Sequence, residues 1–197
     1  MDLRLCLVVL CSLSTACGGT VTSPATDGGS ETIVAGPPSS GGAYFQVQGG
    51  ADPDAAGKFL SCPDGGRSVT LSVKGADGTD KLVVDGAGGA VAKCTVTAST
   101  FSIDVETAAG SFAASGTYTT TATTMVSTDA AVTLAFPGAS YKTGSTKCTI
   151  DFDPTQSTGG KLYGKVTCTK LAHTSIATDA CAISAINGSF FRFANCK

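Results

Sequence analysis

The chain lacks the side chains on which several classes of function depend. It has no tryptophan, and only 14% of its residues are charged, with a formal net charge of −2. A nucleic-acid-binding surface needs a clear basic excess, so we expect no nucleic-acid partner. The single histidine, His173, excludes a site built on several histidines, and no CxxC pair offers the spacing of a cysteine-rich zinc site. We therefore expect neither a metal nor a cofactor.

Motifs of hydrolytic enzymes are also missing. The chain has no G-x-S-x-G sequence, which would present a serine nucleophile between a strand and a helix. A serine triad would have to recruit His173, which lies in no local signature. A nucleophilic pair of Cys181 with His173 would need a free thiolate in place of a disulfide. The sequence thus predicts a non-enzymatic protein with no catalytic residue.

Closely spaced carboxylates are the remaining candidates for chemistry. Calcium binds loop carboxylates, but the full D-x-[DN]-x-[DN]-G pattern is missing, so solvated turn residues explain them better. A glycoside hydrolase would bring two carboxylates about 5–10 Å apart. The sequence shows no cluster of exposed aromatic residues for stacking on a sugar. The residues concerned are Asp52, Asp54, Asp77, Asp80, Asp104, Glu106, Asp151 and Asp153.

The first seventeen residues have the organisation of a secretory signal. Arg4 precedes an apolar stretch from Leu5 to Leu13, and small residues follow up to Cys17. The apolar stretch falls far short of the roughly 20 residues that a membrane span needs. A charged start, a short apolar core and a small-residue end predict a signal peptide over residues 1–16.

A cysteine directly after small residues resembles the lipobox of bacterial lipoproteins. The resemblance implies that Cys17 receives a diacylglyceryl group, that the chain is cut before it, and that the new amino group is acylated, for example with palmitate. Ser14 stands where the family prefers leucine, so cleavage by an ordinary secretory peptidase remains an alternative. Gly18, in place of an aspartate, favours the outer membrane of the cell envelope, facing either the periplasm or the surface.

The number of cysteines agrees with lipidation. Cys6 and Cys11 leave with the signal, and if Cys17 carries lipid, six cysteines remain: Cys62, Cys94, Cys148, Cys168, Cys181 and Cys196. An even number fits three disulfides in an oxidising compartment. Two or more acyl chains anchor a protein stably, since each buried methylene contributes about 0.8 kcal/mol. The membrane is therefore an expected partner, through Cys17.

Composition divides the rest of the chain into a tether and one domain. Most residues between 18 and 42 are Gly, Pro, Ser or Thr, which bury too little apolar surface to offset the entropy of ordering. We expect a flexible tether over residues 17–42, beginning at the lipidated cysteine. Residues 43–197 are numerous enough for a single well-buried core. The stretch from Lys147 to Cys196 is similar to the C-terminal half of many β-rich bacterial lipoproteins.

The expected domain is all-β, because apolar residues alternate with polar ones almost everywhere and no stretch has a helical period. Nine or ten short, mostly antiparallel strands with one apolar face each predict a β-sandwich, with a closed β-barrel as the alternative. The clearest alternating stretches are residues 68–74, 92–97, 101–106, 112–118, 132–136, 148–152 and 162–168.

One hairpin can be predicted in register. If Cys148 faces Cys168, Ile150 faces Val166 and the ring of Phe152 covers Gly164, all on one face. A disulfide closing this loop should stabilise the fold by about 3 kcal/mol.

The other two disulfides are hypotheses, because six cysteines allow 15 connectivities. We pair Cys62 with Cys94 and Cys181 with Cys196. The second pair assumes that Asn187-Gly188 forms a hairpin turn between 182–186 and 189–193, and one long bulged strand is the alternative.

Together these features predict a membrane-anchored, extracytoplasmic lipoprotein that binds, adheres or serves as an envelope scaffold, for an unknown surface or envelope ligand. A carrier of an apolar ligand is the first alternative, and it would need a cavity of several hundred Å³. A secreted hydrolase that uses two carboxylates is the second.

Overall fold

The computed structural model describes residues 37–49, 61–74 and 79–197. These residues form an all-β fold with short 3₁₀ segments as its helical elements, so the predicted fold class is confirmed. The predicted signal peptide, Cys17 and most of the tether lie outside the described residues, as do Asp52, Asp54 and Asp77.

Fifteen strands and two 3₁₀ helices make up the described fold, and their bounds follow the alternating stretches of the sequence. They are β1 (Ser40–Gly49), β2 (Ser68–Leu71), β3 (Val73–Lys74), β4 (Asp80–Lys81), β5 (Val83–Val84), η1 (Ala87–Gly89), β6 (Val91–Val96), β7 (Thr100–Thr107), β8 (Gly110–Thr117), β9 (Thr119–Thr120), β10 (Met125–Phe136), β11 (Ala139–Lys142), β12 (Cys148–Phe152), β13 (Lys161–His173), β14 (Ala180–Ile183), η2 (Ala185–Asn187) and β15 (Phe190–Ala194).

The strand count exceeds the predicted nine or ten for a physical reason. Four of the strands, β3, β4, β5 and β9, have only two residues and are too short to carry a periodic signal. The stretch 68–74, expected as one strand, is divided into β2 and β3 at Ser72. At the other end of the domain, β1 begins at Ser40, so residues 40–42 belong to the sheet and not to the expected tether.

Thirteen strands form one antiparallel network, and three long strands, β1, β10 and β13, change neighbours along their length. β1 pairs first with β15 and then with β14. The first part of β10 pairs with β9 and β12 and its second part with β8 and β11, with a register shift between Ser127 and Ala130. β13 pairs first with β12 and β15 and then with β11 and β14, with a shift between Cys168 and Leu171. Such irregularities bend a strand, so β10 and β13 pass from one layer of the fold to the other.

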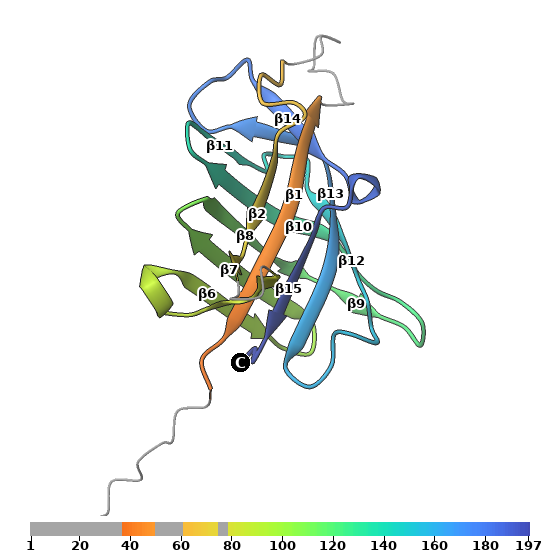
Figure 1. Ribbon diagram of the computed structural model, residues 1–197. Coiled ribbons are helices and arrows are strands. Elements are labelled where there is room, and N and C mark those ends of the chain that lie inside the picture. The colour runs from red at the N-terminus through yellow and green to blue at the C-terminus, as the bar shows by residue number, and fades with distance from the viewer. Residues whose placement is uncertain (1–36, 50–60, 75–78) are drawn as a thin grey trace, which may run out of the picture. The chain divides into compact units, whose positions relative to one another are not determined.

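The network thereby folds into two layers. The front layer contains β2, β5, β15, β12 and β9, with most of β1 and the first parts of β13 and β10. The back layer contains β6, β7, β8, β11 and β14, with the second parts of β10 and β13. The front strands cross the back strands at a steep angle (Figure 1). This is a sandwich with strands bending at its corners. The outer edge of β6 is covered by Lys197, which bonds through its backbone to Val96 and Cys94.

Aromatic rings from both layers meet in the core. Phe45 of β1 and Phe191 of β15 lie against Phe112 of β8, with ring centroids 6.3 and 5.9 Å apart. Phe101 of β7 meets Phe152 of β12 edge to face at 5.1 Å. All five side chains are at most 5% exposed. Burying one such ring contributes on the order of 2 kcal/mol, and edge-to-face contacts add to this.

The predicted Cys148–Cys168 hairpin is confirmed. The two cysteines form a disulfide, Ile150 pairs with Val166, and Phe152 pairs with Gly164. One detail differs, because the ring that lies closest to Gly164 comes from Phe191 on the neighbouring strand.

The other two predicted disulfides are wrong. Cys62 is bonded to Cys181 and Cys94 to Cys196, across 119 and 102 positions of the sequence. Cys62 reaches β14 because Ser61 forms a parallel bridge to Asp179. The Cys94–Cys196 disulfide joins β6 of the back layer to the chain after β15 of the front layer. Both pairings depend on how distant segments meet, which local patterns do not specify.

The predicted hairpin at Asn187-Gly188 is also wrong, and the alternative of one long bulged strand is closer. β14 and β15 each pair with β1 and β13, so they follow one another in the same position of the network. Between them, η2 begins at a Ser184 cap and ends at Gly188, whose φ of 81° lies in the left-handed region that favours glycine. Asn187-Gly188 does form a turn, but this turn ends η2 between β14 and β15 and does not join two paired strands.

Candidate functional site

Cys181 and His173, the nucleophile and base considered from the sequence, do not form a catalytic pair. Cys181 is in a disulfide with Cys62 and has no thiol to ionise. The Nδ1 atom of His173 accepts hydrogen bonds from the backbone N–H groups of Ser175 and Ile176, at 3.1 and 3.0 Å. A triad histidine must donate from that atom to a carboxylate, so His173 is not placed for this role.

The candidate carboxylates within the described ranges are spread over several elements, and only Asp104 and Glu106 share a strand. Asp104 and Glu106 share the outer face of β7, where partial burial, and then the charge of Glu106, raise the pKa of Asp104. Asp80 accepts a hydrogen bond from Ser72, while Asp151 of β12 pairs in register with Lys165. Asp153 caps its own turn, where hydrogen bonds from Thr155 and Gln156 lower its pKa.

These carboxylates do not assemble a metal site in the described part of the chain, where no group of three or more ligating side chains occurs. Of Asp104 and Glu106, only Glu106 lines a surface hollow, between η1 and the β7–β8 turn, and the other lining residues there are small.

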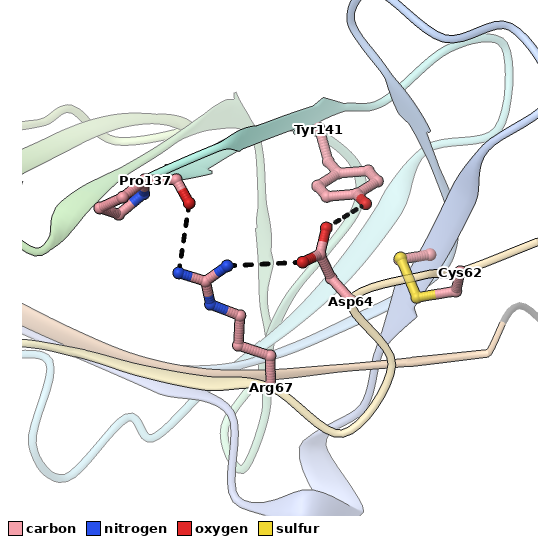
Figure 2. A network of polar contacts seen from close by, with 6 residues as sticks. Cys62, Asp64, Arg67, Pro137 and Tyr141 are labelled. Carbon is pink, nitrogen blue, oxygen red and sulfur yellow. Dashed lines mark hydrogen bonds and ion pairs between the residues drawn. A yellow bond between two sulfur atoms is a disulfide. The ribbon is translucent and has the colours of Figure 1, made fainter.

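A polar cluster that the sequence did not reveal lies at the β11 end of the fold. Figure 2 shows the hydroxyl of Tyr141 and the guanidinium of Arg67 both directed at the carboxylate of Asp64. Tyr141 donates to Asp64 at 2.7 Å, and Arg67 approaches the other carboxylate oxygen at 3.4 Å. Arg67 also donates to the carbonyl of Pro137 and lies 4.2 Å over the ring of Phe136. We call Asp64, Arg67 and Tyr141 the tyrosine clamp.

The tyrosine clamp is a structural feature. Tyr141 is fully buried, and this burial, followed by the hydrogen bond to Asp64 and its charge, raises the pKa of the hydroxyl well above its ordinary value. Asp64 and Tyr141 bond to each other, and Arg67 bonds to Asp64 and to the backbone, so the clamp satisfies its own carboxylate and hydroxyl. Together with the Cys62–Cys181 disulfide, the clamp holds the loop before β2 against β11 and β14.

The outer face of the front layer carries a row of three aromatic rings, which we call the aromatic strip. Tyr44 of β1 pairs in register with Phe190 of β15, and their ring centroids are 6.0 Å apart. Tyr163 of β13 lies 5.9 Å from Phe190 on the other side. The rings are tilted by only 34° and 31°, so they form a shallow, continuous apolar surface. Phe190 is 37% exposed, which is high for a phenylalanine.

A hollow of about 230 Å³, the front hollow, opens beside the aromatic strip. It exists partly because Gly42 occupies the outward position opposite Arg192 and presents no side chain there. A Cβ at Gly42 would come within 2.9 Å of the carbonyl oxygen of Leu71, so the fold tolerates no larger residue without a shift. The lining residues are Gly42, Ala43, Tyr44, Thr70, Leu71, Ser72, Asp80, Lys81, Leu82, Phe190 and Arg192.

Cationic side chains border the strip and the hollow. Arg192 and Lys81 are exposed and line the hollow, and Lys161 and Lys165 continue along the outer face of β13. Lys165 pairs in register with Asp151, whereas Arg192 lies opposite Gly42 and Tyr163. The side chain of Arg192 forms no hydrogen bond or ion pair with any other described residue. Its guanidinium is therefore available for a ligand.

The sequence showed no cluster of exposed aromatic residues, and in the structure one ring of the strip, Phe190, is exposed while Tyr44 and Tyr163 are half-buried. The sequence did contain a signal, in the adjacent pairs Tyr44-Phe45 and Phe190-Phe191. Successive side chains of a strand point to opposite faces, so one ring of each pair has to face outward. The sequence could not show that β1, β15 and β13 are neighbours, which is what places the three outward rings in one row.

In the residues described, no helix is both long enough and apolar enough to cross a bilayer. No protein-family model, no curated protein and no solved structure gives a significant match to the chain.

Proposed function

We propose that the protein is a lipid-anchored, extracytoplasmic binding domain of the bacterial cell envelope, non-enzymatic, which contacts its ligand with the outer face of the front layer. The observation that carries the proposal is the aromatic strip beside the front hollow. Three disulfides within one domain are typical of an oxidising, extracytoplasmic compartment, which supports the location.

The disulfide pattern also supports the proposed anchor. All six cysteines of the described domain are paired with one another. In a mature chain that begins at Cys17, this residue is the one cysteine outside those disulfides. Lipidation of its sulfur accounts for its having no cysteine partner. Gly18 stands in place of an aspartate directly after Cys17, which supports an outer-membrane location.

A binding role suits the strip because its rings are already ordered before any ligand arrives. Tyrosine and phenylalanine on paired strands lose little further conformational entropy on binding, and aromatic anchors dominate the energetics of many interfaces. The first alternative, an apolar carrier, has less support because rings from both layers already meet in the core. The hydrolase alternative has two neighbouring carboxylates on one strand but no shared hollow.

The anchor is tested by an intact mass of the protein extracted from its own membrane, with and without reduction and thiol alkylation. The expected result is acyl mass on an N-terminal Cys17 and six thiols that react only after reduction. A mature chain that starts at another residue, or a thiol that reacts without reduction, would contradict it.

The binding face is tested by photo-cross-linking in the producing cell, with no assumption about the ligand. A photo-reactive phenylalanine analogue replaces Phe190 in the full chain, and a matched variant carries it at Thr133, an exposed position on the outer face of β10 in the back layer. We expect adducts from position 190 and not from position 133. Adducts from position 133 alone would place the binding face elsewhere.

A further inference from the structure

We infer, on the basis of the proposed function, that the front hollow binds a carboxylate-bearing sugar unit of an acidic polysaccharide. The sugar ring lies against Phe190 and Tyr44, and the carboxylate is held by the guanidinium of Arg192. The polymer continues along the aromatic strip towards Tyr163, between the side chains of β13 and β15.

Arg192 carries the recognition of the carboxylate. A guanidinium presents several N–H donors in a planar fork that matches a carboxylate with two parallel hydrogen bonds. Arg192 is exposed, and its neighbours across the strands are a glycine and the ring of Tyr163. It thus projects beside an apolar surface, in a hollow that it shares with Lys81 and Asp80. This arrangement favours an anionic group attached to a ring with an apolar face.

The remaining charges strengthen this preference. The acidic side chains near this face keep their negative charge, but each has a partner: Asp80 accepts from Ser72, Asp151 pairs in register with Lys165, and Asp153 accepts from its own turn. Arg192, Lys81 and Lys161 have no acidic residue opposite them in register. The four cations Arg192, Lys81, Lys161 and Lys165 outnumber these three carboxylates, so the face is cationic although the whole chain has a net charge of −2. Charge complementarity selects an acidic ligand over a neutral one.

The size and lining of the hollow indicate a sugar. At about 230 Å³ it lies below the roughly 300–1,000 Å³ of pockets that enclose a drug-sized ligand, so it suits one ring of a longer molecule. Beside the rings it offers the hydroxyl of Thr70, the carboxylate of Asp80 and the ammonium of Lys81. Hydroxyl groups around a sugar need such mixed donors and acceptors, whereas its C–H face needs an aromatic surface.

An anionic membrane surface is a different partner that would also use rings and cations, and Ile186, 95% exposed, is close in sequence to the strip. The structure favours the sugar because Tyr44 and Tyr163 are half-buried and Tyr44 lines the front hollow, whereas insertion into a membrane needs protruding side chains. The membrane is therefore an outcome of the test.

The experiment measures binding of the full chain in detergent to immobilised polygalacturonate and to its fully methyl-esterified form, at about 0.15 M salt. The two polymers share a backbone and differ in the free carboxylate. We expect esterification to weaken binding at least tenfold. Arg192→Gln should weaken binding to the acidic polymer to the level of the ester, and Arg192→Lys should have an intermediate effect because it keeps the charge without the fork. Phe190→Ala should weaken binding to both polymers.

Lys142→Gln is the control for charge, because Lys142 is exposed on β11 of the back layer. It should leave both affinities unchanged, and an equal loss in Lys142→Gln and Arg192→Gln would overturn the inference as non-specific attraction. Equal binding of both polymers that Phe190→Ala abolishes would overturn the acidic sugar and leave the proposed function standing. Binding to phosphatidylglycerol vesicles but to neither polymer would replace the sugar by a membrane. No binding, with no cross-linking from position 190, would remove both proposals.

Discussion

The outer faces of the two layers differ although their inner faces are alike. Both inner faces are built from Phe, Ile, Leu and Val, which the shared core requires. The outer face of the back layer carries small residues of high or moderate exposure, including Thr95, Ser102, Ala113, Ser115, Ala131 and Thr133. The outer face of the front layer carries Tyr44, Tyr163 and Phe190 with Arg192.

This difference separates what folding requires from what it permits. Threonine and serine suit a solvated strand, because β-branched and small polar side chains fit the pleated surface without exposing large apolar groups. The back layer shows that this composition is sufficient for an outer face of this fold. Folding therefore does not explain the three rings of the front layer, which supports a binding role for that face.

The largest effect we predict comes from the disulfide that joins the layers. Replacing Cys94 and Cys196 by alanine should lower the free energy of unfolding by about 4–5 kcal/mol, since the bridge closes a loop of about 100 residues in the unfolded chain. Removing Cys148–Cys168, which lies in the front layer and closes a much shorter loop, should cost about 3 kcal/mol. Denaturant unfolding measures both, and a larger loss for the short loop would show that strain or packing outweighs chain entropy.

The second prediction concerns the inner surface of the front layer, where a glycine makes room for a ring. In Gly164→Ala the new Cβ would lie 2.6 Å from Cζ of Phe191 and 2.9 Å from Cγ2 of Ile150, so we expect a loss of about 1–3 kcal/mol from overpacking. Gly144→Ala is the control, because nothing lies within 4 Å of its Cβ position. Its stability should stay within about 0.5 kcal/mol of the wild type. Equal stability of both variants would mean that Phe191 moves away freely.

The third prediction concerns the tyrosine clamp, which holds the loop before β2. Tyr141→Phe removes one hydrogen bond to Asp64 but leaves the contact with Arg67, so the loss should be about 1–2 kcal/mol at pH 7. The folded protein raises the pKa of Tyr141, so the wild type should lose stability as the pH rises above about 10, where only the unfolded chain ionises. The variant should lack this component of the alkaline loss. The same alkaline profile in both proteins would contradict the role given to Tyr141.

The smallest effects are expected on the back layer's outer face, from two aspartates with opposite pKa shifts. The folded state raises the pKa of Asp104, chiefly by partial burial, so its charge opposes folding at neutral pH. Asp104→Asn should therefore raise the unfolding temperature at pH 7. The difference should fade as the pH falls through the raised pKa and below the ordinary value near 4.

Asp129 is the matched residue with the opposite pKa shift. Hydrogen bonds from Thr117 and Ser127 lower its pKa, so its carboxylate stabilises the fold at pH values above the ordinary pKa of aspartate. This contribution is lost as the pH falls through the lowered pKa of the folded state. Asp129→Asn should lower the unfolding temperature at pH 7 and lose that effect in acid. Both changes should amount to less than about 1 kcal/mol, because exposed charges are screened by water. Shifts of the same sign in the two variants would contradict the assignment.

Local patterns in the sequence determined a substantial part of this fold. Alternation with a period of two predicted the strands, since only strands place every second side chain on one face. The Cys148–Cys168 hairpin was predicted to the residue because both strands lie close in sequence and share one register. The turns Thr97-Ala98-Ser99-Thr100 and Thr121-Ala122-Thr123-Thr124 show the same locality, because their similar sequences form the same hydrogen bonds between first and last residues.

Only the tertiary structure decided which distant segments meet. An alternating pattern gives each strand an inner and an outer face but does not name its neighbours, and the register shifts in β10 and β13 that fold the network into layers have no periodic signature. The pairings Cys62–Cys181 and Cys94–Cys196, the tyrosine clamp and the aromatic strip all join segments far apart in the chain. They arise from packing between and across strands, where the gain in burial outweighs the entropy of closing long loops.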